Sequence, residues 1–187
     1  YKRQDYTRAY RDVALPQKLD EQPDRFSGPI ILGGHQPELF HPGVWAKNFI
    51  ANRWAQENEG VGLQILIDTD TPKTMGIHAP GGSLKRPSLE YLPFDRRSER
   101  VPYEAWEIQD PSEFASFGDR VNQCVSPLIA NSFIKRYWSK VLERANSVGQ
   151  VGLCIAQARH QVEAEWGLQT LELPQSEICK STAFRWF

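Results

Sequence analysis

Two short apolar runs, separated by an amphipathic stretch, constrain the fold of this chain more than any other feature. The first run covers residues 29–32 and the second covers residues 63–67. Both runs are continuous rather than alternating in hydrophobicity, which is typical of parallel strands that are covered on both faces. The sequence therefore predicts buried parallel strands in an α/β protein.

Residues 42–58 are predicted to form the helix that connects the two strands. Apolar residues recur there at three- and four-residue spacing, as on one face of an amphipathic helix. These residues are Trp45, Ala46, Phe49, Ile50 and Trp54. Pro42 suits the first turn, and Gly60 follows the last one. A strand, a helix and a strand form a right-handed βαβ unit, whose ligands bind at the carboxyl edge of the sheet.

The segment from Gly33 to Gly43, between the first strand and this helix, is the candidate working site. Gly33 and Gly34 predict a turn that brings backbone N–H groups and the positive end of the helix dipole to a phosphate or carboxylate. The spacing matches neither GxGxxG nor GxxxxGK[ST], so a dinucleotide fingerprint or a P-loop is not predicted. His35 and His41 add chemistry, because histidine donates to phosphate oxygens, transfers protons or binds metal.

Further polar residues are candidates for the same site. Gln36 offers a donor and an acceptor, and Lys47 is one turn into the helix, where it either neutralises the anion or is merely solvated. Asp68 and Asp70 end the second strand and would point the same way in an extended chain. Such a pair suits Mg²⁺, a ribose hydroxyl or an amine, unless one of them caps the turn. We expect His35 and Asp68 to face one pocket.

Residues 76–110 differ from the rest of the chain and predict an inserted, β-rich hairpin or long loop. The basic residues of this segment alternate with acidic ones, which is typical of a solvated surface rather than of a nucleic-acid or phosphate clamp. They are Lys85, Arg86, Arg96, Arg97 and Arg100. We therefore expect no nucleic-acid partner.

The remaining segments are assigned from periodicity. Core spacing predicts three helices, and alternation predicts a late strand; their ranges are 112–125, 128–145, 152–166 and 168–173. The late strand is followed by residues 176–187, which begin a new helix or loop. Within them, Cys179 to Thr182 is either a second phosphate-contacting loop or a helix N-cap. Tyrosines at positions 1, 6 and 10 predict an N-terminal docking arm.

Composition limits the remaining possibilities. The 187 residues, with a net charge of −1, fit a single domain (1–187) without a polyanionic partner. The apolar runs are too short to cross a bilayer, so we expect a soluble, cytoplasmic protein without a membrane partner. Cys124, Cys154 and Cys179 lack the spacing of a disulfide framework or a zinc site, and no metal site is predicted. Because an initiator Met is missing, we expect a fragment of a longer chain, with a missing partner domain or a homo-oligomer.

The stretch from Ile31 to Phe40, the helix that contains Lys47 and the strand that ends at Asp70 resemble the cysteine-adding enzyme family of bacillithiol biosynthesis. That family has a Gly-Gln-Gln-Pro-Gly-Leu-Phe-like loop, a lysine-bearing helix and a strand that ends in an acidic cluster. His35 stands where the family has its first glutamine. The resemblance implies a Rossmann-like, nucleotidyltransferase/HUP-like parallel sheet flanked by helices.

The resemblance also implies a bacterial ligase or nucleotidyltransferase-like enzyme that binds a nucleotide or another phosphorylated small-molecule substrate, with ATP or another nucleotide and Mg²⁺ as cofactors. In this reading His35, His41 and Lys47 are catalytic. The substrate-binding and phosphate-binding residues are Gly33, Gly34, Gln36, Asp68 and Asp70. Two alternatives remain open: a non-catalytic small-molecule-binding or assembly module that retains the fold, and a sugar-modifying protein of polysaccharide biosynthesis, which the His-Gln-Pro loop also resembles.

Overall fold

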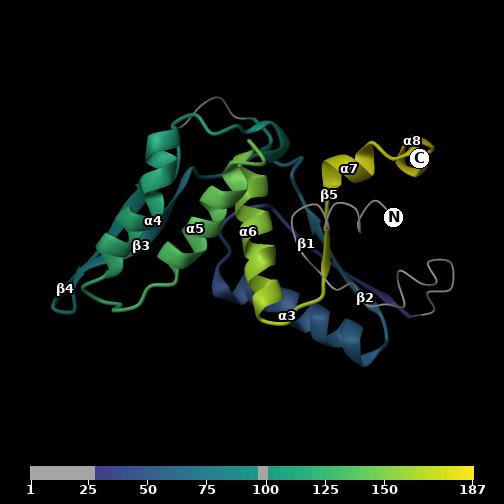
Figure 1. Cartoon of the computed structure of the whole chain (residues 1–187), viewed down its shortest axis with the longest axis horizontal. Coiled ribbons are helices and arrows are strands. Elements are labelled where there is room, and N and C mark those ends of the chain that lie inside the picture. Colours follow the sequence, from purple (N-terminus) through teal and green to yellow (C-terminus); the bar gives the residue numbers. More distant parts are fainter. Residues whose placement is uncertain (1–27, 97–100) are drawn as a thin grey trace. The chain divides into compact units, whose positions relative to one another are not determined.

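The computed structural model describes residues 28–96 and 101–187, which divide into two compact units (Figure 1). The first unit contains residues 28–69 and 159–187, and the second contains the described residues between 70 and 158. The second unit is thus inserted into the sequence of the first. The single-domain assignment stays a prediction, and each unit is described by itself.

A three-stranded parallel sheet forms the centre of the first unit, in the order β1-β2-β5. Its strands are β1 (Ile30–His35), β2 (Val61–Leu66) and β5 (Leu171–Pro174). In the register of the sheet, Leu32 is opposite Leu63 and Leu63 is opposite Leu171. The predicted α/β class and the parallel pairing of the two apolar runs are therefore confirmed.

Only the middle strand is buried in the way that the apolar runs predict. β2 is buried along almost its whole length, whereas Ile30 and Leu32 of β1 are 51% and 61% exposed. The expectation that both faces of the first strand are covered is therefore wrong. Of the three strands, β2 alone has a strand on each side, and side chains of β1 alternate between a half-covered face and an open one.

Helix α3 (Pro42–Glu57) confirms the predicted helix but presents the opposite face to the sheet. It packs against β1 and β2 with small and polar side chains: Asn48, Ala51, Asn52 and Ala55 are buried. Phe49, Ile50 and Trp54 are exposed. Periodicity identified the helix, but hydrogen bonds of the two buried asparagines to distant segments, such as that of Gln169 N–H to Asn52 Oδ1 at 2.7 Å, help to fix its orientation.

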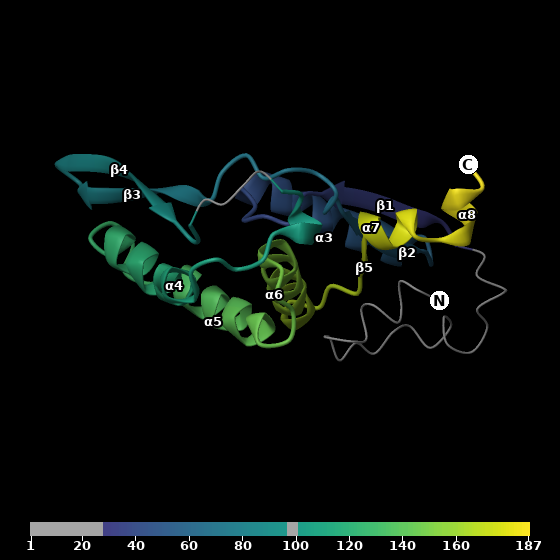
Figure 2. The ribbon, with the colours of Figure 1, turned by 90° about the horizontal axis from the view of Figure 1, so that it is seen from above.

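The second unit contains an antiparallel hairpin and a group of helices. The hairpin lies within the predicted insertion, and α4 packs along it (Figures 1 and 2). The elements are β3 (Gly76–Ser83), β4 (Arg86–Pro93), η2 (Tyr103–Ala105), α4 (Pro111–Val125), α5 (Ile134–Ala145) and the start of α6 (Val151–Glu165). α5 begins six residues later than predicted, after a turn that contains Pro127. The core of this unit is aromatic, and Trp138 donates through Nε1 to the carbonyl oxygen of Phe114 at 2.7 Å.

After β5 the chain forms two short helices, α7 (Gln175–Cys179) and α8 (Thr182–Arg185). Ser181 Oγ accepts a hydrogen bond from Phe184 N–H at 3.2 Å, so Ser181 is the N-cap of α8, as one of the two alternatives predicted. The other alternative, a phosphate-contacting loop, stays a prediction. All three cysteines are free thiols. The N-terminal arm and two of the basic residues, Arg97 and Arg100, lie outside the described residues. Within the described residues, no helix combines the length and apolarity needed to cross a membrane.

Candidate functional site

The carboxyl ends of the three parallel strands meet at one edge of the sheet in the first unit. β1 ends at His35, which is opposite Leu66 at the end of β2, and Ile67 N–H donates to the carbonyl oxygen of His35 at 3.0 Å. Leu66 is in turn opposite Pro174, the last residue of β5. The loop that follows β1 therefore shares this edge with the residues that follow β2 and β5.

One hydrogen bond of the His35 ring indicates its tautomer. Its Nδ1 lies 3.1 Å from the carbonyl oxygen of Gln36. A carbonyl oxygen only accepts, so Nδ1 carries the proton, and Nε2 of the neutral ring has a lone pair. The ring also meets Phe40 edge-on, with 4.6 Å between the ring centroids. His35 thus offers a proton acceptor at Nε2.

His41 has the opposite tautomer. It is the N-cap of α3, and its Nδ1 accepts a hydrogen bond from Gly43 N–H at 3.1 Å. In the neutral ring the proton is therefore on Nε2, and the side chain is exposed. The loop between β1 and α3 is thus flanked by an acceptor nitrogen on His35 and a donor nitrogen on His41.

The first turn of α3 does not offer the backbone anion site that the sequence predicted. Pro42 has no N–H, and Gly43 N–H donates to His41. The N–H groups of Val44 and Trp45 both donate to the carbonyl oxygen of His41, at 2.8 and 3.1 Å. An anion at this end of the helix would have to be bound mainly by side chains.

Gly33 and Gly34 lie inside β1 and not in the predicted turn. A Cβ on Gly33 would lie 2.5 Å from Oε1 of Gln64, its cross-strand partner, and one on Gly34 would lie 3.2 Å from the carbonyl oxygen of Ile65. Close packing between β1 and β2 therefore accounts for both glycines without a bound phosphate.

Asp68 is buried at the sheet edge and connects two distant segments. Its Oδ1 accepts a hydrogen bond from Ser176 N–H at 2.9 Å, and its Oδ2 accepts one from Ser176 Oγ at 2.6 Å. Nearby, Thr69 Oγ1 donates to Gln175 Oε1 at 3.1 Å. Both carboxylate oxygens of Asp68 are thus occupied by the chain itself, and the residue holds the end of β2 against the start of α7.

The other predicted site residues are more dispersed. Lys47 is exposed on α3, four residues after Gly43, so both lie on the same side of the helix. Asp70 belongs to the second unit, where its Oδ1 accepts a hydrogen bond from Thr71 N–H at 2.8 Å. The structure therefore places His35, Gln36, His41 and Asp68 on segments that share the sheet edge, and divides the predicted aspartate pair between the units.

Four buried ionisable residues of the first unit were not predicted. Arg159, His160 and Glu163 lie on α6, and Glu172 lies on β5. Arg159 Nη2 donates to Glu172 Oε1 at 2.5 Å, and Arg159 Nε lies 3.5 Å from Glu163 Oε1. The available signal was the position of Glu172, between two leucines of a short apolar strand.

This buried group also supports the candidate loop. The guanidinium of Arg159 stacks over the ring of Phe40 at 4.3 Å. Glu163 Oε1 accepts hydrogen bonds from Trp45 Nε1 at 2.6 Å and from Asn48 Nδ2 at 2.7 Å. The loop and α3 are therefore attached to α6 by directional contacts, and the hydrogen bonds to Glu163 are charge-assisted.

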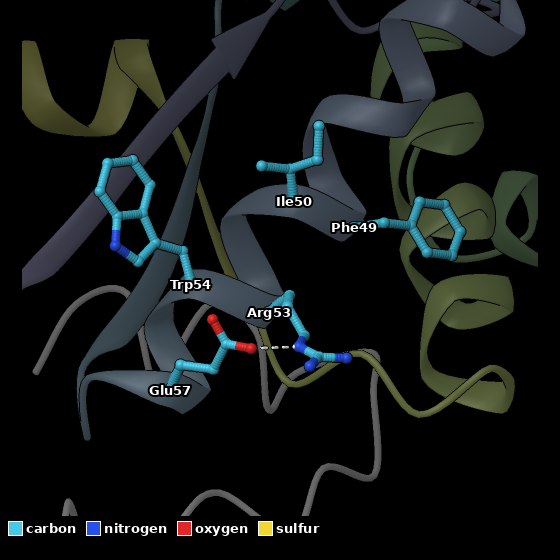
Figure 3. A pocket seen from close by; sticks show the side chains of 5 residues that line it. All are labelled: Phe49, Ile50, Arg53, Trp54 and Glu57. Carbon is cyan, nitrogen blue, oxygen red and sulfur yellow. Dashed lines mark hydrogen bonds and ion pairs between the residues drawn. The ribbon is translucent and has the colours of Figure 1, made fainter.

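The outward side of α3 forms an open hollow of about 550 Å³ (Figure 3). It is lined by Phe49, Ile50, Arg53, Trp54 and Glu57. Arg53 and Glu57 form an ion pair at 2.6 Å, whereas Phe49 and Trp54 point to opposite sides of the helix. Ile50 and Trp54 are 62% and 58% exposed, so the hollow is an apolar surface with a charged rim.

The first unit thus defines an α/β protein whose three-stranded parallel sheet carries polar side chains at its carboxyl edge. When the sequence is compared with models of protein families and with curated proteins, none of them matches. The function is therefore inferred from the residues of the site and their chemistry.

Proposed function

We propose that the carboxyl edge of the parallel sheet binds a nucleotide or another phosphorylated small molecule, and that the protein is a ligase or nucleotidyltransferase-like enzyme with a Rossmann-like fold. One observation carries the proposal: at the two ends of one loop, His35 Nδ1 contacts a carbonyl oxygen, whereas His41 Nδ1 accepts from a backbone N–H, so the two rings favour opposite tautomers. An acceptor nitrogen and a donor nitrogen on one loop suit proton transfer beside a charged phosphoryl group.

Each group has a defined role in such a transfer. The attacking hydroxyl, amine or thiol forms a bond to phosphorus and gives its proton to His35 Nε2, while the bond to the leaving pyrophosphate breaks. His41 Nε2–H donates to a phosphoryl oxygen, and the Lys47 ammonium compensates the charge that builds up there. Asp68 orders the edge through its two hydrogen bonds from Ser176.

The location of the site agrees with the general behaviour of parallel sheets, whose ligands bind beyond the carboxyl ends of the strands. The resemblance to the cysteine-adding enzyme family supports the reaction class. The step is written without Mg²⁺, and its predicted ligand Asp68 accepts hydrogen bonds from Ser176 with both carboxylate oxygens. The donors that act on the phosphate are side chains of this chain.

Ligand-dependent thermal stability tests the binding site. ATP, ADP, inorganic phosphate and a sugar phosphate are added in turn to wild-type protein and to His41→Ala, with His78→Ala as the matched control because His78 is an exposed histidine of the second unit. Loss of one hydrogen bond to a charged group should weaken phosphate binding about tenfold or more in His41→Ala. If none of these ligands stabilises the wild-type protein, the proposal is wrong.

Exchange of label between pyrophosphate and ATP, with candidate acceptors supplied, tests the chemistry separately. Removal of a general base typically slows a reaction by about 10²–10⁴-fold, so His35→Ala should bind ATP but lose exchange by this factor. Exchange that survives His35→Ala unchanged would show that His35 is not the proton acceptor. Stabilisation by the sugar phosphate alone favours the sugar-modifying alternative.

A second candidate function, a non-catalytic assembly module, is favoured by the exposed apolar side of α3. Ile50 and Trp54 are exposed there, and Phe49 lines the same hollow but points away from Trp54 (Figure 3). In this case Ile50→Glu should reduce self-association in sedimentation equilibrium, whereas Lys47→Glu on the same helix should have a smaller effect. A wild-type protein that is monomeric at every concentration contradicts self-assembly.

A further inference from the structure

One nitrogen and two carboxylate groups converge in the interior of the first unit. His160 and Glu163 of α6 and Glu172 of β5 each contribute one potential ligand atom, and these atoms lie within 4.8 Å of one another. All three side chains are fully buried. The group includes a histidine, and it lies where unpaired charge is expensive.

Hydrogen bonds to the surrounding chain already occupy one atom of His160 and one of Glu172. His160 Nε2 lies 2.6 Å from the carbonyl oxygen of Thr170, so Nε2 donates and Nδ1 of the neutral ring has the lone pair. Glu172 Oε1 accepts from Arg159. His160 Nδ1 and Glu172 Oε2 then face each other at 3.8 Å, which is longer than a hydrogen bond but fits two ligands of one cation.

In Glu163, too, one carboxylate oxygen is held by the surrounding chain and the other is a potential ligand. Its Oε1 accepts hydrogen bonds from Trp45 and Asn48. Its Oε2 is buried and has no hydrogen-bond partner among the residues that the structure describes. A buried carboxylate oxygen without a partner carries a desolvation penalty, and a bound cation removes that penalty.

We propose that His160 Nδ1, Glu163 Oε2 and Glu172 Oε2 bind one divalent first-row transition ion, such as Zn²⁺ or Mn²⁺. One imidazole and two carboxylates form a ligand set that suits these ions, at distances of about 2.0–2.2 Å. The other atom of each ligand is held by Thr170, by Arg159, or by Trp45 and Asn48, as the outer partners of metal ligands are in metalloproteins. Because the three ligands are buried, the ion stabilises the junction of α6 and β5.

Metal titration of the full chain tests this site. Protein treated with EDTA is titrated with Zn²⁺ and with Mn²⁺ by calorimetry, and its thermal stability is measured with and without each ion. One ion per chain should bind and raise the melting temperature. Glu163→Gln keeps the oxygen that accepts from Trp45 and Asn48, and it should weaken binding at least about 10–100-fold. Glu57→Gln, which removes an exposed carboxylate, should leave binding unchanged.

Pulsed electron paramagnetic resonance of bound Mn²⁺ keeps the proposal testable if Glu163→Gln fails to fold, because it needs only the wild-type protein. Coupling of the ion to a histidine nitrogen is expected and should disappear in His160→Gln. Bound Mn²⁺ without nitrogen coupling overturns the site, as does unchanged affinity in a folded Glu163→Gln. If neither ion binds the wild-type protein, the proposal fails.

Discussion

The guanidinium carbon of Arg159 lies 4.3 Å from the centre of the Phe40 ring. The same ring contacts His35 edge-on, with 4.6 Å between the ring centroids. The guanidinium also donates a hydrogen bond to the buried Glu172. A single aromatic side chain thus connects the candidate loop to a buried ion pair. Changes on α6 and β5 are therefore expected to alter the geometry of the loop.

Phe40→Leu should loosen His35 without leaving a buried charge unpaired. Leucine retains much of the apolar volume but loses the cation–π contact, which contributes about 1 kcal/mol when partly buried. We expect a free energy of unfolding lower by about 1 kcal/mol in urea titrations, and a mixture of tautomers for His35 in nitrogen NMR spectra. Phe184→Leu, at an exposed site in α8, is the control. An unaltered His35 spectrum in Phe40→Leu would show that Phe40 does not position the ring.

Arg159→Met should be strongly destabilising. It leaves the fully buried carboxylates of Glu163 and Glu172 without their guanidinium partner, and loss of one member of a buried ion pair costs about 3–5 kcal/mol. Arg53→Met removes an ion pair whose arginine side chain is 77% exposed, and should cost no more than about 1 kcal/mol. Urea unfolding of both variants measures the difference. If both variants lost the same free energy of unfolding, the ion pairs of Arg159 with Glu163 and Glu172 would contribute no more than the exposed pair of Arg53.

Gly33→Ala tests whether sheet packing explains the glycines of β1. The added methyl group would lie 2.5 Å from Oε1 at the end of the Gln64 side chain, which has to shift in its buried position, so we expect a cost of about 1 kcal/mol, at the low end for overpacking. Gly149→Ala is the control, since nothing lies within 4 Å of its added methyl group. The double variant Gly33→Ala/Gln64→Ala should lose less stability than the sum of the two single variants. If the losses of stability in the two single variants simply added up in the double variant, the methyl group would not clash with Gln64.

Asp110, the N-cap of α4, should make the free energy of unfolding depend on pH in the acidic range. The backbone N–H of Glu113, the Ser112 hydroxyl and the charge of Arg96 hold the pKa of Asp110 below its ordinary value. Because the folded-state pKa is lowered, this contribution is fully present above the unfolded pKa of about 3.9 and is lost as the pH falls through the folded pKa. The stability difference between wild type and Asp110→Asn should be constant from pH 5 to 7 and shrink below pH 4. If the stability difference between the two proteins grew below pH 4, the pKa of Asp110 would be raised by folding and not lowered.

Cys154 should be unreactive in the folded protein. Burial raises the pKa of its thiol to about 12, and its Sγ donates to the carbonyl oxygen of Val148 at 3.2 Å. Only the thiolate reacts readily. Alkylation at pH 8, followed by mass spectrometry, should modify Cys154 only at the rate of unfolding, whereas the half-exposed Cys179 should react in the native state. Rapid native-state labelling of Cys154 would be inconsistent with its burial.

The elements of the fold were largely predictable because their signals are local. Hydrophobic periodicity identified α3, and two apolar runs identified β1 and β2, since each signal lies within one segment of the chain. The orientation of α3 was not predictable. It depends on hydrogen bonds of Asn48 and Asn52 to residues more than one hundred positions away, and an apolar stripe normally faces the core.

The candidate site was predictable in its location and less so in its chemistry. His35 ends β1 and His41 caps α3, so they flank the loop between these elements, but their tautomers follow from backbone partners that only the structure reveals. Arg159 and Glu163, four residues apart on a helix, have the spacing of an ordinary surface ion pair. The sequence does not reveal that this pair is buried, because Arg159 also binds Glu172, which lies on a different segment, strand β5.

The order of strands in the sheet has a consequence for synthesis on the ribosome. Asp68 and Ser176, which meet at the sheet edge, are 108 residues apart, and the whole second unit is translated between them. Translation proceeds at about 5–20 residues per second, so β5 is synthesised on the order of 5–20 s after β2. During this interval one edge of the most apolar strand is open, so chaperone binding is expected to be strongest on nascent chains that have not yet reached Leu171.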